Sequence, residues 1–382
     1  MSDKIKVMTV FGTRPEAVKM CPVVKAIEKN EQLESIVCVT AQHRQMLDQV
    51  LSMFGVVPDY DLDIMKDRQT LSDITARVLD GLNKVFEDAR PDIVLVHGDT
   101  TTTFVAALSA FYHKIAVGHV EAGLRTFDKY FPYPEEMNRK MAGVISDIHF
   151  SPTQNNKRNL LNENISEDII FVTGNTVIDA LKDTYRDIYS FEEEELRKLD
   201  FENKRVIAVT AHRRENLGGP LENICRALKR IAAEYRDTEI VYPVHMNPVV
   251  RDTVNSVIGG IDNIKLIKPV GVADMHNLIG RSYIVATDSG GLQEEAPSLG
   301  VPVLVLRNET ERPEAVDAGT VKLIGCKEED VYSNLKRLLD DKEAHNKITG
   351  SQNPYGDGNA SERIVEALLY YFKKSDVRPD EF

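Results

Sequence analysis

Two carboxylates follow two successive apolar runs of the chain, in the segments DIVLVHGDTTTT and IAVGHVEAGLRT. Short apolar runs bounded by polar residues are typical of buried strands in a parallel sheet. Asp99 and Glu121 would then lie at the carboxyl ends of two strands, the edge where open α/β sheets bind ligands. Asp99 could instead be a plain helix cap, which is the commoner use of the residue. Two carboxylates at one edge suit general acid–base chemistry, because close like charges separate their proton affinities.

A third apolar run, Val206–Thr210, leads into His212 and two arginines in the segment VIAVTAHRREN. A histidine beside arginines at a strand end suits a phosphate-bearing ligand, whereas a charged surface loop is the alternative interpretation. Glu135 and Glu136, in PEEMNR, fall in the first turn of a predicted helix. Negative charge there ordinarily complements the helix dipole, so Glu135 is either such a residue or a third carboxylate of the site.

Two further segments could bind a diphosphate. In FGTRPE, Thr13 can cap a helix, and Arg14 and Lys19 lie around the N-terminus of that helix, where an anion is favoured. A capped surface helix explains the same residues equally well. In VATDSGGLQEEAPSLG, a strand is followed by backbone N–H groups at a helix start and by two acids that could bind ribose hydroxyls. The residues concerned are Ser289, Gly290, Gly291, Glu294 and Glu295; Arg312, farther on, is either a phosphate ligand or a surface ion pair.

These residues require two doubly wound parallel sheets to position them. Strand-like runs alternate with amphipathic helical stretches in both halves of the chain, which is the pattern of repeated βαβ units. We predict one domain over residues 1–180 and a second over 200–360, separated by the charged segment YSFEEEELRKLDFENK, which is interpreted as a solvated helix. The last helical stretch, Ser361–Lys373, could pack on either half, and we expect residues 361–382 on the first. A ligand cleft between the two sheets is expected.

Composition excludes several classes of function. The 382 residues include 42% apolar residues and no run long enough for a membrane span, and the start of the chain lacks a signal-peptide layout. The net charge of −13 disfavours binding to nucleic acid or to anionic membranes. The cysteines at positions 21, 38, 225 and 326 lack metal-like spacing and indicate buried thiols in a reducing cytoplasm. The chain contains no GxGxxG, Walker A, CxxC or HExxH motif, and Asp61-Leu62-Asp63 is expected in a solvated turn.

Ten motifs occur in order over almost the whole chain. They are FGTRPE, VHGDTTTT, GHVEAGLRT, PEEMNR, TGNTVID, TAHRREN, YPVHMNP and TDSGGLQEEAPSLG, followed by PVLVLR and TERPE. In these motifs the chain resembles the non-hydrolysing UDP-N-acetylglucosamine 2-epimerases. The resemblance implies a glycosyltransferase-B-like fold and the interconversion of UDP-N-acetylglucosamine and UDP-N-acetylmannosamine without NAD or a metal. It also implies a cytoplasmic homodimer whose product feeds cell-wall and surface polysaccharides.

The resemblance also assigns roles by position. It implies a catalytic group of Asp99, Glu121, Glu135 and His212. It implies UDP or substrate contacts from Arg14, Lys19, Ser289, Gly290, Gly291, Glu295 and Arg312. A second UDP-N-acetylglucosamine, acting as an allosteric activator, would contact Gln42, His43, Gln45, Arg68, Arg213 and His245. Some family members place an aromatic residue near the uracil where this chain has Met275 and His276.

The implied reaction eliminates UDP to a 2-acetamidoglucal and adds it back, with proton transfer on opposite faces of C2, and we expect the two domains to close over the ligand. Which carboxylate serves which face is left open. The alternatives are a hydrolysing epimerase that releases free N-acetylmannosamine, a retaining glycosyltransferase, and a UDP-sugar sensor without turnover.

Overall fold

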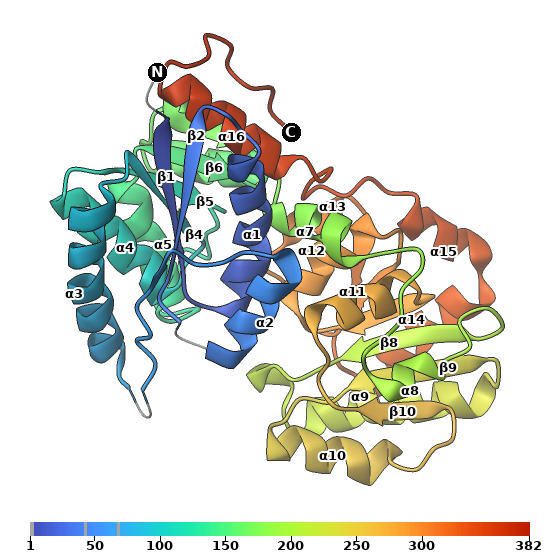
Figure 1. Ribbon diagram of the computed structural model, residues 1–382. Coiled ribbons are helices and arrows are strands. Elements are labelled where there is room, and N and C mark those ends of the chain that lie inside the picture. Colours follow the sequence, from blue (N-terminus) through green and yellow to red (C-terminus); the bar gives the residue numbers. More distant parts are fainter. Residues whose placement is uncertain (1–3, 42–43, 67–68) are drawn as a thin grey trace. The chain divides into compact units, whose positions relative to one another are not determined.

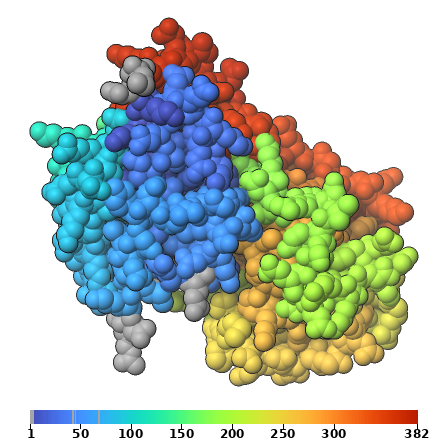
Figure 2. All heavy atoms as spheres, in the orientation of Figure 1, coloured from blue at the N-terminus to red at the C-terminus, as the bar shows by residue number. Residues whose placement is uncertain are grey.

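The computed structural model describes residues 4–41, 44–66 and 69–382, which divide into two compact units. Unit 1 comprises Met1–Ala180 and Tyr355–Phe382, and unit 2 comprises Leu181–Pro354. In Figures 1 and 2, unit 1 runs from blue to green and includes the red C-terminal end, whereas unit 2 runs from yellow-green to orange-red. None of the described helices is both long enough and apolar enough to cross a membrane.

Unit 1 is built on a parallel sheet of seven described strands in the order β3-β2-β1-β4-β5-β6-β7. The strands are β1 (Ile5–Phe11), β2 (Leu33–Val39), β3 (Tyr60–Asp61), β4 (Ile93–His97), β5 (Ala116–Val120), β6 (Ile148–Ser151) and β7 (Ile170–Val172). The connecting helices are α1 (Arg14–Glu28), α2 (Arg44–Phe54), α3 (Leu71–Ala89), α4 (Thr101–Tyr112), α5 (Glu135–Ile145), α6 (Gln154–Asn162) and α7 (Thr176–Thr184). The C-terminal helix α16 (Ala360–Tyr371) packs against α1 (Figure 1).

Local signals explain why the helices of unit 1 begin where they do. Thr13 accepts a hydrogen bond from the backbone of Glu16, which bonds back to Thr13, and this reciprocal cap starts α1 as predicted. Thr100 caps α4 in the same position relative to its helix. One prediction was wrong in part. Asp61 is exposed but belongs to the edge strand β3, where it pairs with Val39, because the chain after α2 returns to the sheet, whereas Leu62 and Asp63 follow outside any strand.

Unit 2 repeats the design with a six-stranded parallel sheet of order β10-β9-β8-β11-β12-β13. Its strands are β8 (Arg205–Thr210), β9 (Thr238–Pro243), β10 (Ile264–Ile267), β11 (Ile284–Thr287), β12 (Val303–Val305) and β13 (Val321–Leu323). Its helices are α8 (Glu194–Arg197), α9 (Gly219–Glu234), α10 (Pro248–Ile258), α11 (Val272–Gly280), α12 (Gly290–Ser298), α13 (Pro313–Asp317), α14 (Glu328–Asp340) and α15 (Lys342–Thr349). Both sheets are parallel and flanked by helices, so the predicted fold class is confirmed (Figure 1).

The charged segment before β8 differs from the prediction of a solvated helix. Only Glu194–Arg197 is helical, as the short α8. Phe191 is buried and stacks on Phe201 with ring centroids 5.7 Å apart. Asp274 accepts hydrogen bonds from the Tyr189 hydroxyl and from two backbone N–H groups of the segment. Burial of the aromatic side chains therefore draws this charged stretch onto unit 2. The four cysteines are buried, as predicted.

Candidate active site

Glu121 stands at the end of β5 and is held from two other elements of unit 1. Its backbone φ of +62° lies in the left-handed region, which a non-glycine residue seldom adopts without a local reason. The ammonium group of Lys19, on α1, pairs with Glu121 Oε2. Asn175, before α7, donates to the same oxygen at 2.9 Å. The carboxylate is 9% exposed, so the ion pair lies largely out of water and is only weakly screened by salt.

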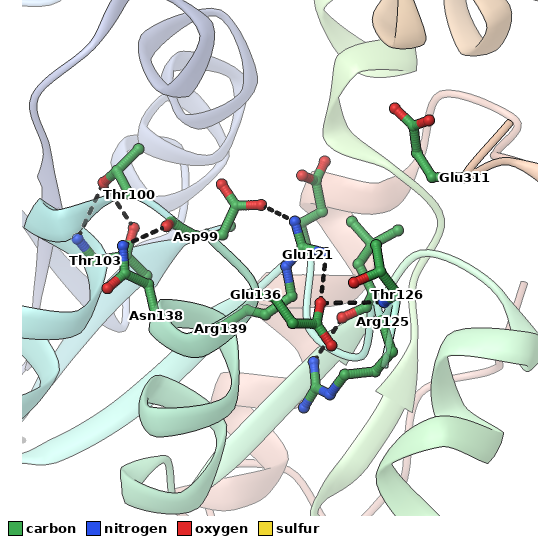
Figure 3. A network of polar contacts seen from close by, with 12 residues as sticks. Asp99, Thr100, Thr103, Glu121, Arg125, Thr126, Glu136, Asn138, Arg139 and Glu311 are labelled. Atoms are coloured by element: carbon green, nitrogen blue, oxygen red, sulfur yellow. Dashed lines mark hydrogen bonds and ion pairs between the residues drawn. The ribbon is translucent and has the colours of Figure 1, made fainter. Parts of the chain in front are cut away.

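Asp99 stands at the end of the neighbouring strand β4, just after Gly98, whose φ is +65°. The guanidinium of Arg139, on α5, pairs with Asp99 Oδ2, and Asn138 Nδ2 donates to the backbone carbonyl of Asp99 at 2.9 Å (Figure 3). The predicted pair of carboxylates at one sheet edge is therefore present, because β4 and β5 are hydrogen-bonded neighbours. Each carboxylate is paired with a cation: Lys19 for Glu121, and for Asp99 Arg139, which also lies 3.1 Å from Glu136.

The two acids that open α5 differ in their surroundings. Glu136 is 0% exposed and accepts hydrogen bonds from the backbone N–H groups of Thr126 and Phe127 at 3.1 and 3.0 Å, so it ties down the loop after β5 (Figure 3). Glu135 is half-buried, and its Oε2 is a buried oxygen without a hydrogen-bond partner among the described residues. A buried acceptor without a donor is costly, which favours Glu135 over Glu136 as a group with a task beyond the fold.

Three buried histidines lie on adjacent strands of unit 1. His97, His119 and His149 lie on β4, β5 and β6 and are buried. Burial disfavours the charged ring and lowers the pKa of His97 and His119 to about 4 and that of His149 to about 3. His97 Nε2 lies 3.7 Å from Glu121 Oε2. All three rings are therefore uncharged at physiological pH, and His97 is the one that lies beside Glu121.

Glu16 joins the loop after β1 to the start of α4. The carboxylate is buried and accepts hydrogen bonds from the N–H groups of Gly12 (3.1 Å) and Thr13 (2.8 Å) and from the Thr100 hydroxyl (2.8 Å). Burial raises its pKa, against these hydrogen bonds, which lower it. Arg14, the first residue of α1, is half-buried and has no carboxylate within ion-pair distance in the described part of the chain. Its guanidinium is thus open to an anionic ligand.

In unit 2, the predicted histidine follows β8 and lies against β11. The fully buried carboxylate of Asp288, just after β11, accepts hydrogen bonds from the backbone N–H groups of His212 (2.7 Å) and Arg213 (2.8 Å). The His212 ring is 41% exposed and stacks on His245 with centroids 4.9 Å apart. Burial lowers the pKa of His212, and Asp288 opposes this shift. The confirmed strand β8 therefore presents a partly exposed imidazole with a carboxylate behind it.

The glycine pair predicted to bind a diphosphate opens α12. Ser289 precedes this helix, and its side chain makes no capping hydrogen bond to it. A Cβ atom added at Gly290 would lie 2.5 Å from Nη1 of Arg312, so glycine is needed for the guanidinium to approach the helix start. Arg312 is held there by Glu294, whose Oε1 lies 2.5 Å from its Nε. Backbone N–H groups and a half-buried guanidinium thus lie close together, an arrangement that suits an anion.

Glu311 is the centre of a cluster of arginines that sequence reasoning missed. Its carboxylate lies 2.6 Å from Arg307 Nη1, 2.8 Å from Arg312 Nη1 and 3.4 Å from Arg213 Nη2. Burial alone would raise the pKa of Glu311, but the arginines, led by Arg312 and Arg307, outweigh it and lower the value to about 2. Glu311 therefore links the residue predicted at UDP, Arg312, with one predicted at the activator, Arg213.

The remaining predicted residues fall into two groups. Glu295, on α12, lies with its Oε2 3.2 Å from Nε2 of the buried His276, whose Nδ1 is 2.6 Å from the Thr184 hydroxyl. His276 is thus held by two protein partners. Gln45 is in α2, but its side chain and the residues Gln42, His43 and Arg68 lie outside the described residues. Within the described ranges, no three His, Cys, Asp or Glu residues are placed to hold a metal ion.

Known proteins resemble this chain over nearly its whole length. A model of the family described as UDP-N-acetylglucosamine 2-epimerase matches residues 25–369. The UDP-N-acetylglucosamine 2-epimerase of Bacillus subtilis (strain 168) is 57% identical over 379 residues, with 99% of each chain covered. A structure of S. aureus MnaA with UDP has a TM-score of 0.90 at 49% identity and covers 99% of this chain and 100% of that one. The Neisseria meningitidis UDP-GlcNAc 2-epimerase bound to UDP-GlcNAc has a TM-score of 0.88 at 49% identity, covering 96% and 100%.

The two units have the glycosyltransferase-B-like fold of these neighbours, each unit being a helix-flanked parallel sheet. The strand-end carboxylates of unit 1, and the guanidinium beside a helix start in unit 2, are compatible with an enzyme acting on a nucleotide sugar. The family model and the full-length relatives agree with each other. This chain belongs to the UDP-N-acetylglucosamine 2-epimerase family.

Proposed function

We propose that the chain interconverts UDP-N-acetylglucosamine and UDP-N-acetylmannosamine without hydrolysis, by elimination of UDP and its re-addition. One observation carries the proposal: Asp99 and Glu121 follow adjacent strands at one sheet edge, and each is paired with a cation, Arg139 and Lys19 respectively. Two carboxylates at one sheet edge supply the two groups that proton removal and proton delivery at C2 would need. The relative from Neisseria meningitidis binds UDP-GlcNAc, and the one from S. aureus binds UDP.

The chemistry of the sugar explains why two carboxylates are required. C2 of the substrate bears a hydrogen and an acetamido group but has no adjacent carbonyl, so a carbanion there would have no enolate to stabilise it. If the C1–O bond to UDP breaks first, its electron pair leaves with the diphosphate, and positive charge at C1 acidifies the C2 hydrogen. One carboxylate then removes that proton to give the 2-acetamidoglucal. Proton delivery to the opposite face of C2, with re-addition of UDP at C1, completes the inversion.

We assign the proton transfers to unit 1 and the hold on UDP to unit 2. Asp99, Glu121 and Glu135 are the candidates for base and acid. Arg14 and Lys19 are the residues of unit 1 that we propose contact the substrate. Arg312 and the Ser289–Gly291 turn would bind the diphosphate, Glu295 the remainder of UDP, and His212 would donate to the departing oxygen. No step of this route needs NAD or a metal, because no hydride is transferred and the charge that develops is on the diphosphate.

A second UDP-N-acetylglucosamine is proposed as an activator at Arg213 and His245. Support comes from Glu311, because the carboxylate shared by Arg213 and Arg312 gives the two positions a physical connection. The other residues proposed for this site are Gln42, His43, Gln45 and Arg68. We also propose that the enzyme acts as a homodimer in the cytoplasm and supplies precursors for cell-wall and surface polysaccharides.

Incubation of the enzyme with UDP-N-acetylglucosamine alone in heavy water tests the reaction. We expect deuterium at C2 of both sugar nucleotides and an N-acetylmannosamine product still linked to UDP. Free N-acetylmannosamine with UDP would favour a hydrolysing epimerase, and unlabelled substrate would refute proton exchange at C2. The second outcome would leave a retaining glycosyltransferase or a sensor without turnover.

A further inference from the structure

The carboxylate of Asp288 uses only one of its two oxygens to hold the loop after β8. Oδ2 accepts the backbone N–H groups of His212 and Arg213 and also Nδ2 of Asn216 at 3.0 Å. Oδ1 is buried and accepts no hydrogen bond from any residue that the structure describes. It lies 3.9 Å from Nδ1 of the His212 ring. One carboxylate oxygen of Asp288 thus makes all the hydrogen bonds that hold the loop. The other oxygen faces the imidazole of His212.

A buried carboxylate oxygen without a donor is expensive, and native proteins usually retain one where it has a function. The separation of 3.9 Å exceeds a hydrogen bond of about 2.7–3.2 Å, but a modest rotation of the imidazole closes it. Hydrogen bonds of catalytic groups are often long without ligand and tighten in the complex. The other groups that face the ring are His245, stacked on it, and Arg213, and both disfavour positive charge on His212.

We propose that Asp288 is a positioning residue for His212, holding Nδ1–H so that Nε2 faces the departing diphosphate. The inference rests on the proposed function of His212 and deepens it. When the anionic diphosphate is bound, the imidazole takes up a second proton from solvent. In the elimination, the C1–O electron pair goes to the diphosphate oxygen, and Nε2–H of this charged ring donates a hydrogen bond to that oxygen. Both ring protons stay on nitrogen, and Asp288 balances the positive charge. The arrangement follows the logic by which a carboxylate fixes the tautomer of a catalytic histidine.

Asp288→Asn separates this positioning function from a purely structural one. The amide oxygen can keep the three hydrogen bonds that hold the loop, whereas the amide nitrogen then faces Nδ1 and donates to it. The neutral ring is forced to carry its proton on Nε2, and the negative charge that supports the charged ring is gone. Asp274→Asn is the matched control, because Asp274 is also buried in unit 2 and accepts three hydrogen bonds, but from Tyr189 and two backbone N–H groups.

Ring ¹⁵N shifts of His212, measured by NMR across pH on the full chain without ligand, give the test. We expect the neutral wild-type ring to carry its proton on Nδ1, Asp288→Asn to move it to Nε2 and to lower the pKa of His212, and Asp274→Asn to change neither. In steady-state assays Asp288→Asn should lower kcat on the order of 100-fold with little change in KM. A wild-type ring protonated on Nε2, or an unchanged tautomer in Asp288→Asn, would overturn the inference, and the wild-type measurement does so even if the variant fails to fold.

The failure of the proposed function has a different signature. A His212→Gln variant with wild-type kcat would remove His212 from the reaction, and with it the catalytic part of the inference. The ring shifts would still decide whether Asp288 holds Nδ1.

Discussion

Replacing Glu311 by glutamine should destabilise unit 2 in a way that depends on pH. The carboxylate lies within 3.4 Å of a nitrogen of each of three arginines, which lower its pKa from an ordinary value of 4.5 to about 2 although burial opposes them. At about 1.4 kcal/mol for each tenfold change in proton affinity, that difference corresponds to about 3 kcal/mol of stability at pH 7. Glutamine can still accept one hydrogen bond, so we expect Glu311→Gln to lose about 2–3 kcal/mol.

The sign of the pH dependence follows from the direction of the pKa shift. Because the folded pKa of Glu311 lies below its ordinary value, its stabilisation is complete above that value and is lost as pH falls through the folded pKa. At pH 3, the folded and the ordinary pKa of Glu311 together give a stabilisation of about 1.4 kcal/mol, roughly half of that at pH 7. The difference between wild type and Glu311→Gln should therefore shrink as the solution is acidified.

Urea unfolding of the wild type and the variant at pH 7 and pH 3 measures this difference. Hydrogen exchange at the buried amides of β12 assigns the effect to unit 2. Glu309→Gln is the matched control, since Glu309 is exposed in the same loop and should change stability by less than about 0.5 kcal/mol. A loss below about 1 kcal/mol at pH 7, or an equal loss at both pH values, would refute the argument that the arginines stabilise the chain through Glu311.

Three other predictions address the proposed reaction. Asp99→Asn and Glu121→Gln should each lower kcat on the order of 100-fold or more while calorimetry finds UDP bound as in the wild type; a near-normal rate removes that residue from the proton transfers. Arg213→Ala should remove the acceleration that added UDP-N-acetylglucosamine gives to the conversion of pure UDP-N-acetylmannosamine, so that this reaction stays slow; acceleration as in the wild type would show that the activator site is misplaced. Gly290→Ala should weaken UDP binding about tenfold, because the added methyl group would lie 2.5 Å from Nη1 of Arg312 and displace the guanidinium; unchanged calorimetric affinity would contradict that placement.

The sequence was sufficient to predict the strands and to identify the acidic residues at their ends. Runs such as Ile93–Val96 and Val206–Thr210 are apolar and bounded by polar residues, and a parallel sheet buries both faces of its strands, so composition and position agree. The rule that ligands bind at the carboxyl ends then singled out Asp99, Glu121 and His212 without any contact being known. Short edge strands such as β3 and buried aromatics such as Phe191 escaped because tertiary packing overrode a local polar pattern.

The counter-ions could not be predicted in this way. Lys19 and Glu121 are 102 positions apart, and Arg139 and Asp99 are 40 apart, so each pair is created by the strand order and not by local spacing. Arg139 offered no signal beyond its place in PEEMNR. Asp288 is also an acid at a strand end and satisfies the rule that found Asp99, but the separate directions of its two carboxylate oxygens are properties of the fold alone.

The ion pairs that the cations form within the protein also affect how an acidic chain could bind an acidic ligand. With a net charge of −13, the overall field repels UDP, so binding must come from local cations. Of the cations proposed to meet the substrate, Lys19 and Arg312 already have carboxylate partners, whereas Arg14 has none among the described residues. UDP would therefore gain an unopposed attraction at Arg14, while at Arg312 it must share the guanidinium with Glu294 and Glu311. In the proposed reaction, this sharing would let UDP be held firmly enough to return without being trapped, which is the balance that elimination and re-addition would require.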